Sequence, residues 1–229
     1  MLIITLMLPI LNIIINNIIK KSNISLIKKN IGPTGISKRI RKISLIISII
    51  IFNLILYQLL TYNLNDLELQ KRFIFNNFYN FSIGLDSLNL TLITLTAFII
   101  TLLIYFKPEN VTSSISNKKI LNVYNDENIF INNLLILQFF LFLLFLVNDL
   151  FIFYILYELL LIPMFILIIR YGSISKKIEA AFKFFLFTLA GSLLMLLGVL
   201  FIYYYFKTFD LHILSFLLNI QPFYLQCLL

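Results

Sequence analysis

Long apolar runs alternate with short polar stretches along this chain of 229 residues. An α-helix needs about 20 apolar residues to cross a hydrocarbon core that is roughly 30 Å thick. The stretch 130–171 is about 63 Å long as a helix, which is enough for two crossings. The polar pair Asn148-Asp149 is therefore the expected turn within it. The runs predict six spans, at about 2–19, 43–62, 88–106, 130–147, 149–170 and 180–206.

The predicted fold class is an all-α polytopic membrane protein with about six transmembrane helices. We expect a single membrane domain over 1–229, in which the segment 207–229 leads toward a seventh helix. The stretch 63–87 is polar and partly alternating, so it predicts a short β-hairpin outside the membrane.

Composition supports a membrane protein. Hydrophobic residues make up 61% of the chain and charged residues only 12%, whereas soluble domains carry roughly 25% charged residues. The mean hydropathy is +0.99. One cysteine and one histidine exclude an internal disulfide and leave too few ligands for Fe–S, haem or zinc sites.

The net charge of +8 is explained by topology. Of the 18 basic residues, 15 lie between the first and second spans, between the third and fourth, and around the turn after the fifth. The positive-inside rule places these loops on the cytoplasmic or matrix side and the N-terminus outside. The basic loops therefore indicate orientation in a lipid bilayer, and we expect no nucleic-acid partner.

Glu158 is the strongest candidate for chemistry. It lies nine residues after Asp149, about 13 Å along a helix, which places its carboxyl near mid-membrane. An acid at that depth costs about 3 kcal/mol or more unless it is paired, wetted or protonated. Such a residue predicts a proton relay; the alternative is a hydrogen bond that only joins two helices.

Two further residues are candidate relays. Lys183 lies about one turn into the sixth span, where it either relays protons inside the protein or extends to the inner interface. His212, the single histidine, follows that span; a surface position and a relay near an exit are both open.

Three residues are expected to be structural. Pro163 cannot donate its backbone N–H, so it frees the carbonyl of Leu159 beside Glu158 and favours a kink that admits water. Gly191 and Gly198 are seven residues apart on one helix face, where they favour close helix packing.

The region from Asn148 onward resembles a known family. The matching stretches are Asn148-Asp-Leu-Phe-Ile-Phe-Tyr-Ile-Leu-Tyr-Glu158-Leu-Leu-Leu-Ile-Pro-Met164, Arg170-Tyr-Gly, Lys183-Phe-Phe-Leu-Phe-Thr-Leu-Ala-Gly-Ser-Leu-Leu-Met-Leu-Leu, and Phe209-Asp-Leu-His-Ile-Leu214. Upstream, Phe81-Ser-Ile-Gly84-Leu-Asp86-Ser-Leu88 also fits. These stretches resemble NADH dehydrogenase (ubiquinone) subunit 4, an antiporter-like membrane subunit of respiratory complex I, over about 140 residues.

The resemblance implies proton pumping coupled to quinone reduction, with this chain as the N-terminal part of the subunit. Glu158 falls on the family's glutamate in helix five, and Lys183 on a position in helix six that is often lysine. NAD, flavin, Fe–S clusters and ubiquinone are expected elsewhere in the complex, so no cofactor or redox chemistry is expected in this chain. The implied location is the mitochondrial inner membrane; the bacterial plasma membrane is the alternative.

The implied partners are other membrane subunits of complex I. The family pairs its helix-five glutamate with a lysine in a broken helix seven, and the sequence stops at Leu229, before that lysine. We therefore expect a separate chain to carry the rest of the subunit. The alternative functions are a related cation/proton antiporter subunit and a structural scaffold in which Glu158 moves no protons.

Overall fold

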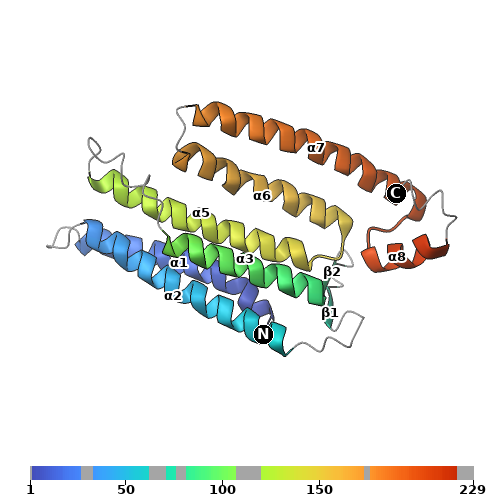
Figure 1. Cartoon of the computed structure of the whole chain (residues 1–229), viewed down its shortest axis with the longest axis horizontal. Coiled ribbons are helices and arrows are strands. Elements are labelled where there is room, and N and C mark those ends of the chain that lie inside the picture. Colours follow the sequence, from blue (N-terminus) through green and yellow to red (C-terminus); the bar gives the residue numbers. More distant parts are fainter. Residues whose placement is uncertain are drawn as a thin grey trace.

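The computed structural model describes residues 2–26, 33–61, 71–75, 81–106, 120–172 and 176–220. Seven helices lie in these ranges, labelled as in Figure 1: α1 (Leu2–Leu26), α2 (Pro33–Leu60), α3 (Ser87–Tyr105), α5 (Ile120–Leu146), α6 (Leu150–Tyr171), α7 (Lys177–Phe206) and α8 (Leu211–Ile220).

The expectation of an all-α polytopic membrane protein is confirmed. Helices α2, α3, α5, α6 and α7 are long and apolar enough to cross a membrane, and α1 contains the shorter apolar stretch Thr5–Ile19. The chain is therefore a multi-pass membrane protein.

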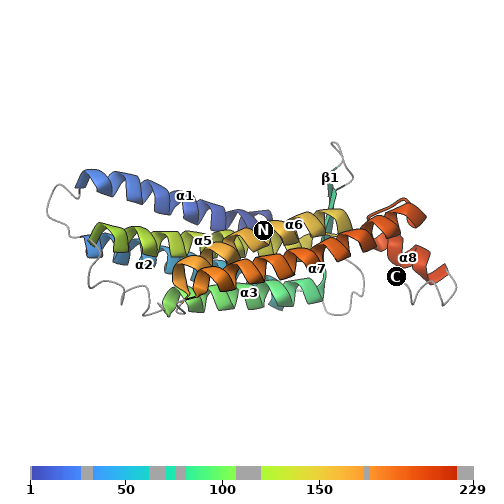
Figure 2. The same ribbon diagram turned by 90° about the horizontal axis from the view of Figure 1, so that it is seen from above.

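The long helices run side by side along the molecule (Figures 1 and 2). Helices α1, α2, α3 and α5 form one group, α6 packs on α5, and α7 packs mainly on α6. Half of the apolar stretch of α5 is buried inside the protein, whereas only 11% of the apolar stretch of α7 is buried. Helix α5 is thus the centre of the bundle, and α7 is a peripheral helix with most of its apolar surface uncovered.

Two apolar clusters hold the four-helix group together at different depths. One contains Leu6 of α1, Ile51 of α2, Ala97 of α3 and Phe142 of α5. Partly buried side chains from α1, α2 and α6 surround the other, which joins α3 to the N-terminal half of α5; its buried members are Ile100, Ile104, Ile131, Leu134, Leu135 and Leu137.

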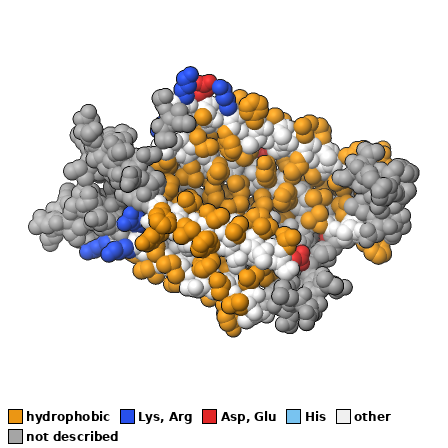
Figure 3. Space-filling view, in the orientation of Figure 1, with side chains coloured by type: hydrophobic (Ala, Val, Ile, Leu, Met, Phe, Trp, Pro, Cys, Tyr) orange, Lys and Arg blue, Asp and Glu red, His pale blue; other side chains and the backbone are white. Residues whose placement is uncertain are grey.

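Charged and apolar side chains separate along the molecule. Hydrophobic side chains cover the middle of the face in Figure 3, and the visible Lys and Arg side chains gather toward one end. The end of α1, the start of α2, the start of α5, the end of α6 and the start of α7 all lie toward that end (Figure 1). The described helix ends that border the predicted basic connections therefore share one end of the bundle.

The predicted hairpin is confirmed at the opposite end. Strands β1 (Lys71–Phe75) and β2 (Phe81–Leu85) pair antiparallel, and β2 leads directly into α3. The α5–α6 turn at Asn148-Asp149 extends this small sheet. An isolated bridge pairs Ile83 with Val147, and the Asn148 N–H donates to the Ser82 carbonyl at 3.1 Å.

The α7–α8 connection binds the other side of the same turn. The Leu150 N–H donates to the Phe209 carbonyl at 3.1 Å, and the Leu211 N–H donates to the Asn148 carbonyl at 3.0 Å. The ring of Phe209 stacks on Tyr203, with 4.4 Å between the ring centroids. The starts of α6 and α8 are thereby fixed to one another by backbone hydrogen bonds.

Candidate functional site

Helix α6 has a capped start. The Asp149 carboxylate accepts hydrogen bonds from the N–H groups of Phe151 at 2.9 Å and Ile152 at 3.1 Å. Such an N-cap satisfies donors that have no partner within the helix. The helix then continues through Pro163 to Tyr171.

Helix α6 ends at Gly172, where a larger side chain would not fit. The N–H of Gly172 donates to the Ile168 carbonyl at 3.0 Å. A Cβ at Gly172 would lie 2.6 Å from that same oxygen, closer than carbon and oxygen atoms approach. Glycine is therefore required here, and the two ends of the helix that carries Glu158 are both defined by local contacts.

Glu158 faces α7. The hydroxyl of Ser192, a residue that is 3% exposed, donates a hydrogen bond to the Glu158 carboxylate. The Ser192 oxygen also lies 2.8 Å from the Leu189 carbonyl, one turn earlier on α7. A hydroxyl has one hydrogen and can also accept, so Ser192 has two acceptors between which its single hydrogen can turn.

Tyr154 completes the polar group on α6. It precedes Glu158 by one turn, so both side chains lie on the same helix face. Its hydroxyl lies near the Glu158 carboxylate and the Ser192 hydroxyl. Three oxygen-bearing side chains from two adjacent spans therefore meet inside an otherwise apolar layer.

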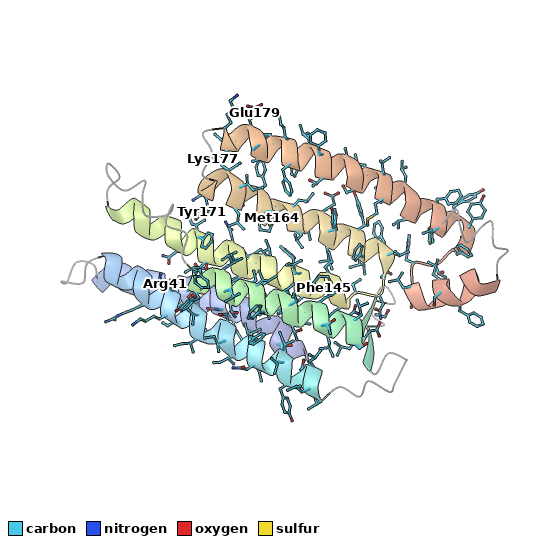
Figure 4. All side chains as sticks on the ribbon, viewed as in Figure 1. Arg41, Phe145, Met164, Tyr171, Lys177 and Glu179 are labelled. Atoms are coloured by element: carbon cyan, nitrogen blue, oxygen red, sulfur yellow. The ribbon has the colours of Figure 1, made fainter. Side chains whose placement is uncertain are left out.

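The opposite face of α6 is apolar. Met164 and Leu167 pack against the α3–α5 cluster, and Figure 4 shows Met164 on the part of α6 that faces α5. Glu158 itself is partly exposed, on the side of α6 that faces α7. Part of its surface is thus left for another group to reach.

Within the described part of the chain, hydroxyl groups are the polar partners of Glu158. An ion pair on the first turns of α7 joins Lys183 to Glu179, 2.8 Å apart, away from Glu158. A hydroxyl stabilises a carboxylate by donation but brings no compensating charge, so a charged Glu158 at this depth remains costly. The described contacts of Glu158 are therefore hydrogen bonds without a countercharge.

Lys183 lies apart from Glu158. Its side chain is 64% exposed, and its ammonium is bound to Glu179 in an i,i+4 pair. Nine residues separate it from Ser192, about 13 Å along α7. Figure 4 shows Glu179 and Lys177 at the α6–α7 end of the molecule. The structure therefore does not bring Lys183 and Glu158 together, and its role as a relay stays a prediction.

The other predicted residues fall into three situations. Pro163 is buried within α6, which is continuous through it. A Cβ at Gly191 or Gly198 would meet nothing within 4 Å, so their predicted partner helix does not lie among the described residues. The backbone of His212 is in α8, but its side chain lies outside what the structure describes.

Sequence reasoning missed Tyr154 and Ser192 as members of the site. The signal for Tyr154 was its spacing of four residues before Glu158. Ser192 was visible only as part of a run of small residues, Ala190-Gly191-Ser192. In the ranges that the structure describes, no group of three or more His, Cys, Asp or Glu side chains is placed to hold a metal ion.

Comparison with known proteins locates this site in a family. Residues 147–228 match the family described as NADH:quinone oxidoreductase/Mrp antiporter, TM. This range includes Glu158, Ser192 and Lys183, and it begins at the α5–α6 turn.

Several relatives match a longer stretch. The chain is 40% identical over 149 residues to NADH-ubiquinone oxidoreductase chain 4 of Acanthamoeba castellanii, which covers 65% of this chain and 28% of that relative. It is 41% identical over 142 residues to the chain 4 of Chondrus crispus, covering 62% and 26%. The Marchantia polymorpha chain 4 is 42% identical over 135 residues, covering 59% and 25%.

The matched stretch thus spans about a quarter of the length of these relatives. Within the matched stretch the identity is 40% to 42%, and the stretch covers 59% to 65% of this chain. The matched stretch is therefore similar to part of NADH-ubiquinone oxidoreductase chain 4, and residues 147–228 match the transmembrane family NADH:quinone oxidoreductase/Mrp antiporter.

Proposed function

We propose that this chain is the N-terminal part of the proton-translocating subunit 4 of NADH:ubiquinone oxidoreductase in the mitochondrial inner membrane. The similarity to chain 4 proteins supports the assignment. Other membrane subunits of the complex are its partners. We expect NAD, flavin, Fe–S clusters and ubiquinone to bind elsewhere in the complex, so that this chain contributes proton movement and no redox chemistry.

The observation that carries the proposal is the Glu158–Ser192 contact. A relay must hold a proton in one state and lack it in the other. When Glu158 is charged, the Ser192 hydroxyl donates to the carboxylate. When Glu158 is protonated, its own O–H can donate to Ser192, and the serine hydrogen turns to the Leu189 carbonyl at 2.8 Å. Both protonation states therefore keep a full set of hydrogen bonds.

Proton release from Glu158 also requires charge compensation. The described residues offer Glu158 hydroxyl groups only. We propose that a basic side chain approaches the partly exposed side of Glu158. It would come from the part of subunit 4 that lies outside the stretch matched by this chain. Movement of that cation toward Glu158 favours the carboxylate, and movement away favours the protonated form.

The test is Glu158→Gln in the assembled complex. Glutamine keeps the shape and accepts the Ser192 hydrogen bond but cannot ionise. A positioned acid–base group contributes roughly 10²-fold to its step, so protons moved per NADH oxidised should fall sharply while NADH oxidation by artificial acceptors continues. Glu158→Asp should retain part of the pumping.

A matched control is Lys183→Gln, since Lys183 is exposed and tied to Glu179. We expect a smaller loss of pumping from this variant than from Glu158→Gln. Full pumping by an assembled Glu158→Gln complex would show that this chain is a scaffold and that Glu158 moves no protons.

A second candidate is a subunit of a cation/proton antiporter. The matched family model spans both NADH:quinone oxidoreductases and Mrp antiporters. If Glu158→Gln abolishes sodium-dependent proton flux in vesicles and leaves quinone reduction and its coupling unchanged, the antiporter assignment is favoured.

A further inference from the structure

Three amide side chains are buried in the helix group away from Glu158. Asn12 and Gln138 are 0% exposed and Asn16 is 2% exposed. Five of their six polar atoms have no hydrogen-bond partner in the described structure: Asn12 Oδ1, both atoms of Asn16 and both atoms of Gln138. The sixth, Asn12 Nδ2, makes a long contact of 3.4 Å with the Ser44 carbonyl.

These amides lie along the seam between α1, α2 and α5. Asn12 and Asn16 are one turn apart on the same face of α1. On α5, Gln138 lies three residues after Leu135 and four residues before Phe142. Each of these neighbours belongs to a cluster that includes side chains of α1 and α2 as well as α3, so Gln138 lies on the face of α5 that is buried in the four-helix group.

The depths of Asn12 and Gln138 also agree. Helices α1 and α5 run antiparallel (Figure 1), and the Asn132 amide donates to the Asn17 amide oxygen at 3.3 Å near the basic end. Gln138 lies six residues after Asn132 on α5, and Asn12 lies five residues before Asn17 on α1. Because the rise per residue is the same in both helices, the two side chains sit at nearly one level.

Helix α2 contributes two hydroxyl groups to the same seam. Ser44 and Ser48 are 0% exposed and lie on the stripe that continues to Ile51. Their hydroxyls donate to their own helix, to the carbonyls of Arg41 and Leu45, both at 2.9 Å. Each serine oxygen therefore keeps lone pairs that can accept another hydrogen bond.

Such a seam is costly when it is dry. Each buried polar group without a partner destabilises the fold, and the surrounding bilayer supplies no compensating hydrogen bonds. The unpartnered atoms include donors (Asn16 Nδ2, Gln138 Nε2) and acceptors (Asn12 Oδ1, Gln138 Oε1). A cation would satisfy only the oxygens, whereas water both donates and accepts.

We propose that ordered water molecules bind in the α1–α2–α5 seam. There they bridge Asn12 and Asn16 to Gln138 and donate hydrogen bonds to the hydroxyl oxygens of Ser44 and Ser48. A buried water makes about three hydrogen bonds, which this set of groups supplies. No ionisable side chain belongs to the set, so the site holds water without relaying protons. It is separate from the α6–α7 interface and does not depend on the role of Glu158.

The first test is a map of the intact membrane complex at a resolution that shows bound water. The proposal expects density peaks within about 2.7 to 3.2 Å of the Gln138 and Asn12 amide atoms. Direct amide–amide hydrogen bonds across the seam, with no density between them, would overturn it.

The second test is X-ray radiolytic labelling of the same complex, in which bound water generates hydroxyl radicals that oxidise adjacent side chains. Phe142 is 1% exposed and one turn from Gln138, so its labelling in the wild type reports internal water. Gln138→Leu should reduce that labelling to background. Asn53→Leu, which replaces an exposed amide of α2, should leave it unchanged. An unlabelled Phe142 in the wild type contradicts the proposal even if the Gln138 variant fails to assemble.

Discussion

Ser192 on α7 donates a hydrogen bond to Glu158 on α6, and this is a direct polar link between the two helices within the membrane layer. The same serine oxygen contacts the Leu189 carbonyl of its own helix. Ser192 is 3% exposed although most of α7 is uncovered. The residue is therefore positioned on the one narrow stripe of α7 that faces α6, where its hydroxyl can respond to the protonation state of the carboxyl.

The first prediction concerns Ser192→Ala. A hydrogen bond to a charged group contributes about 1.5 to 3 kcal/mol, so removing it should lower the rate of proton movement roughly tenfold. The measurement is the initial rate of proton translocation during NADH oxidation by the assembled complex. Ser192→Thr retains a hydroxyl and serves as the control. Wild-type pumping by the alanine variant would show that the contact is only structural.

The second prediction concerns Tyr154→Phe, which removes one hydroxyl and keeps the ring. The Tyr154 hydroxyl is a neutral donor beside the same carboxylate as Ser192, so the same range of about 1.5 to 3 kcal/mol applies and the rate of pumping should fall by a similar factor. Because both hydroxyls lie near Glu158, the double variant should lose more or less than the sum of the two single losses. If the loss in the double variant equals the sum of the two single losses, Tyr154 and Ser192 do not act through the same carboxyl.

Much of the fold follows from the pattern of apolar runs. Transmembrane helices need length and apolar composition, and both are local properties of the sequence. The adjacent polar residues Asn148-Asp149 lie between α5 and α6 because their backbone and carboxyl groups cap the start of α6. The alternating stretch before α3 forms the hairpin because its strands pair with one another.

The site was harder to predict from the sequence. Glu158 stands out as an isolated charge, but a hydroxyl within a span costs little and leaves no comparable signal. Ser192 enters the site only through the packing angle between α6 and α7, which periodicity does not specify. Lys183 shows the converse, since Glu179 one turn earlier gives it an exposed partner on the same helix. The buried amides of α1 and α5 likewise meet only through helix pairing.

The third prediction concerns the start of the helix that carries Glu158. Asp149→Ala removes the carboxylate that accepts from Phe151 and Ile152, a loss of about 1 kcal/mol for an N-cap. We expect a lower temperature of dissociation of the complex and a modest fall in pumping. Asp149→Asn retains the capping oxygen and should behave like the wild type. Equal losses in the two variants would assign the effect to the negative charge rather than to the cap.

The fourth prediction concerns the uncovered face of α7. A Cβ at Gly191 would meet nothing within 4 Å, so Gly191→Ala and Gly191→Phe create no clash with the described residues of this chain. If a helix of another part of the complex packs closely on this face, as small residues in membrane helices favour, the phenylalanine variant should assemble poorly and the alanine variant nearly normally. The measurement is the amount of intact complex on native gels.

The matched control for Gly191→Phe is Leu194→Phe, because Leu194 is 71% exposed on the same helix and already bulky. Lipid tails adapt to the shape of side chains, so they accommodate a phenylalanine at either position. A closely packed helix does not accommodate a new ring at Gly191. Poor assembly of Gly191→Phe together with normal assembly of Leu194→Phe would therefore locate a protein neighbour at Gly191. Normal assembly of both variants would show that this face of α7, one residue from Ser192, is covered by lipid.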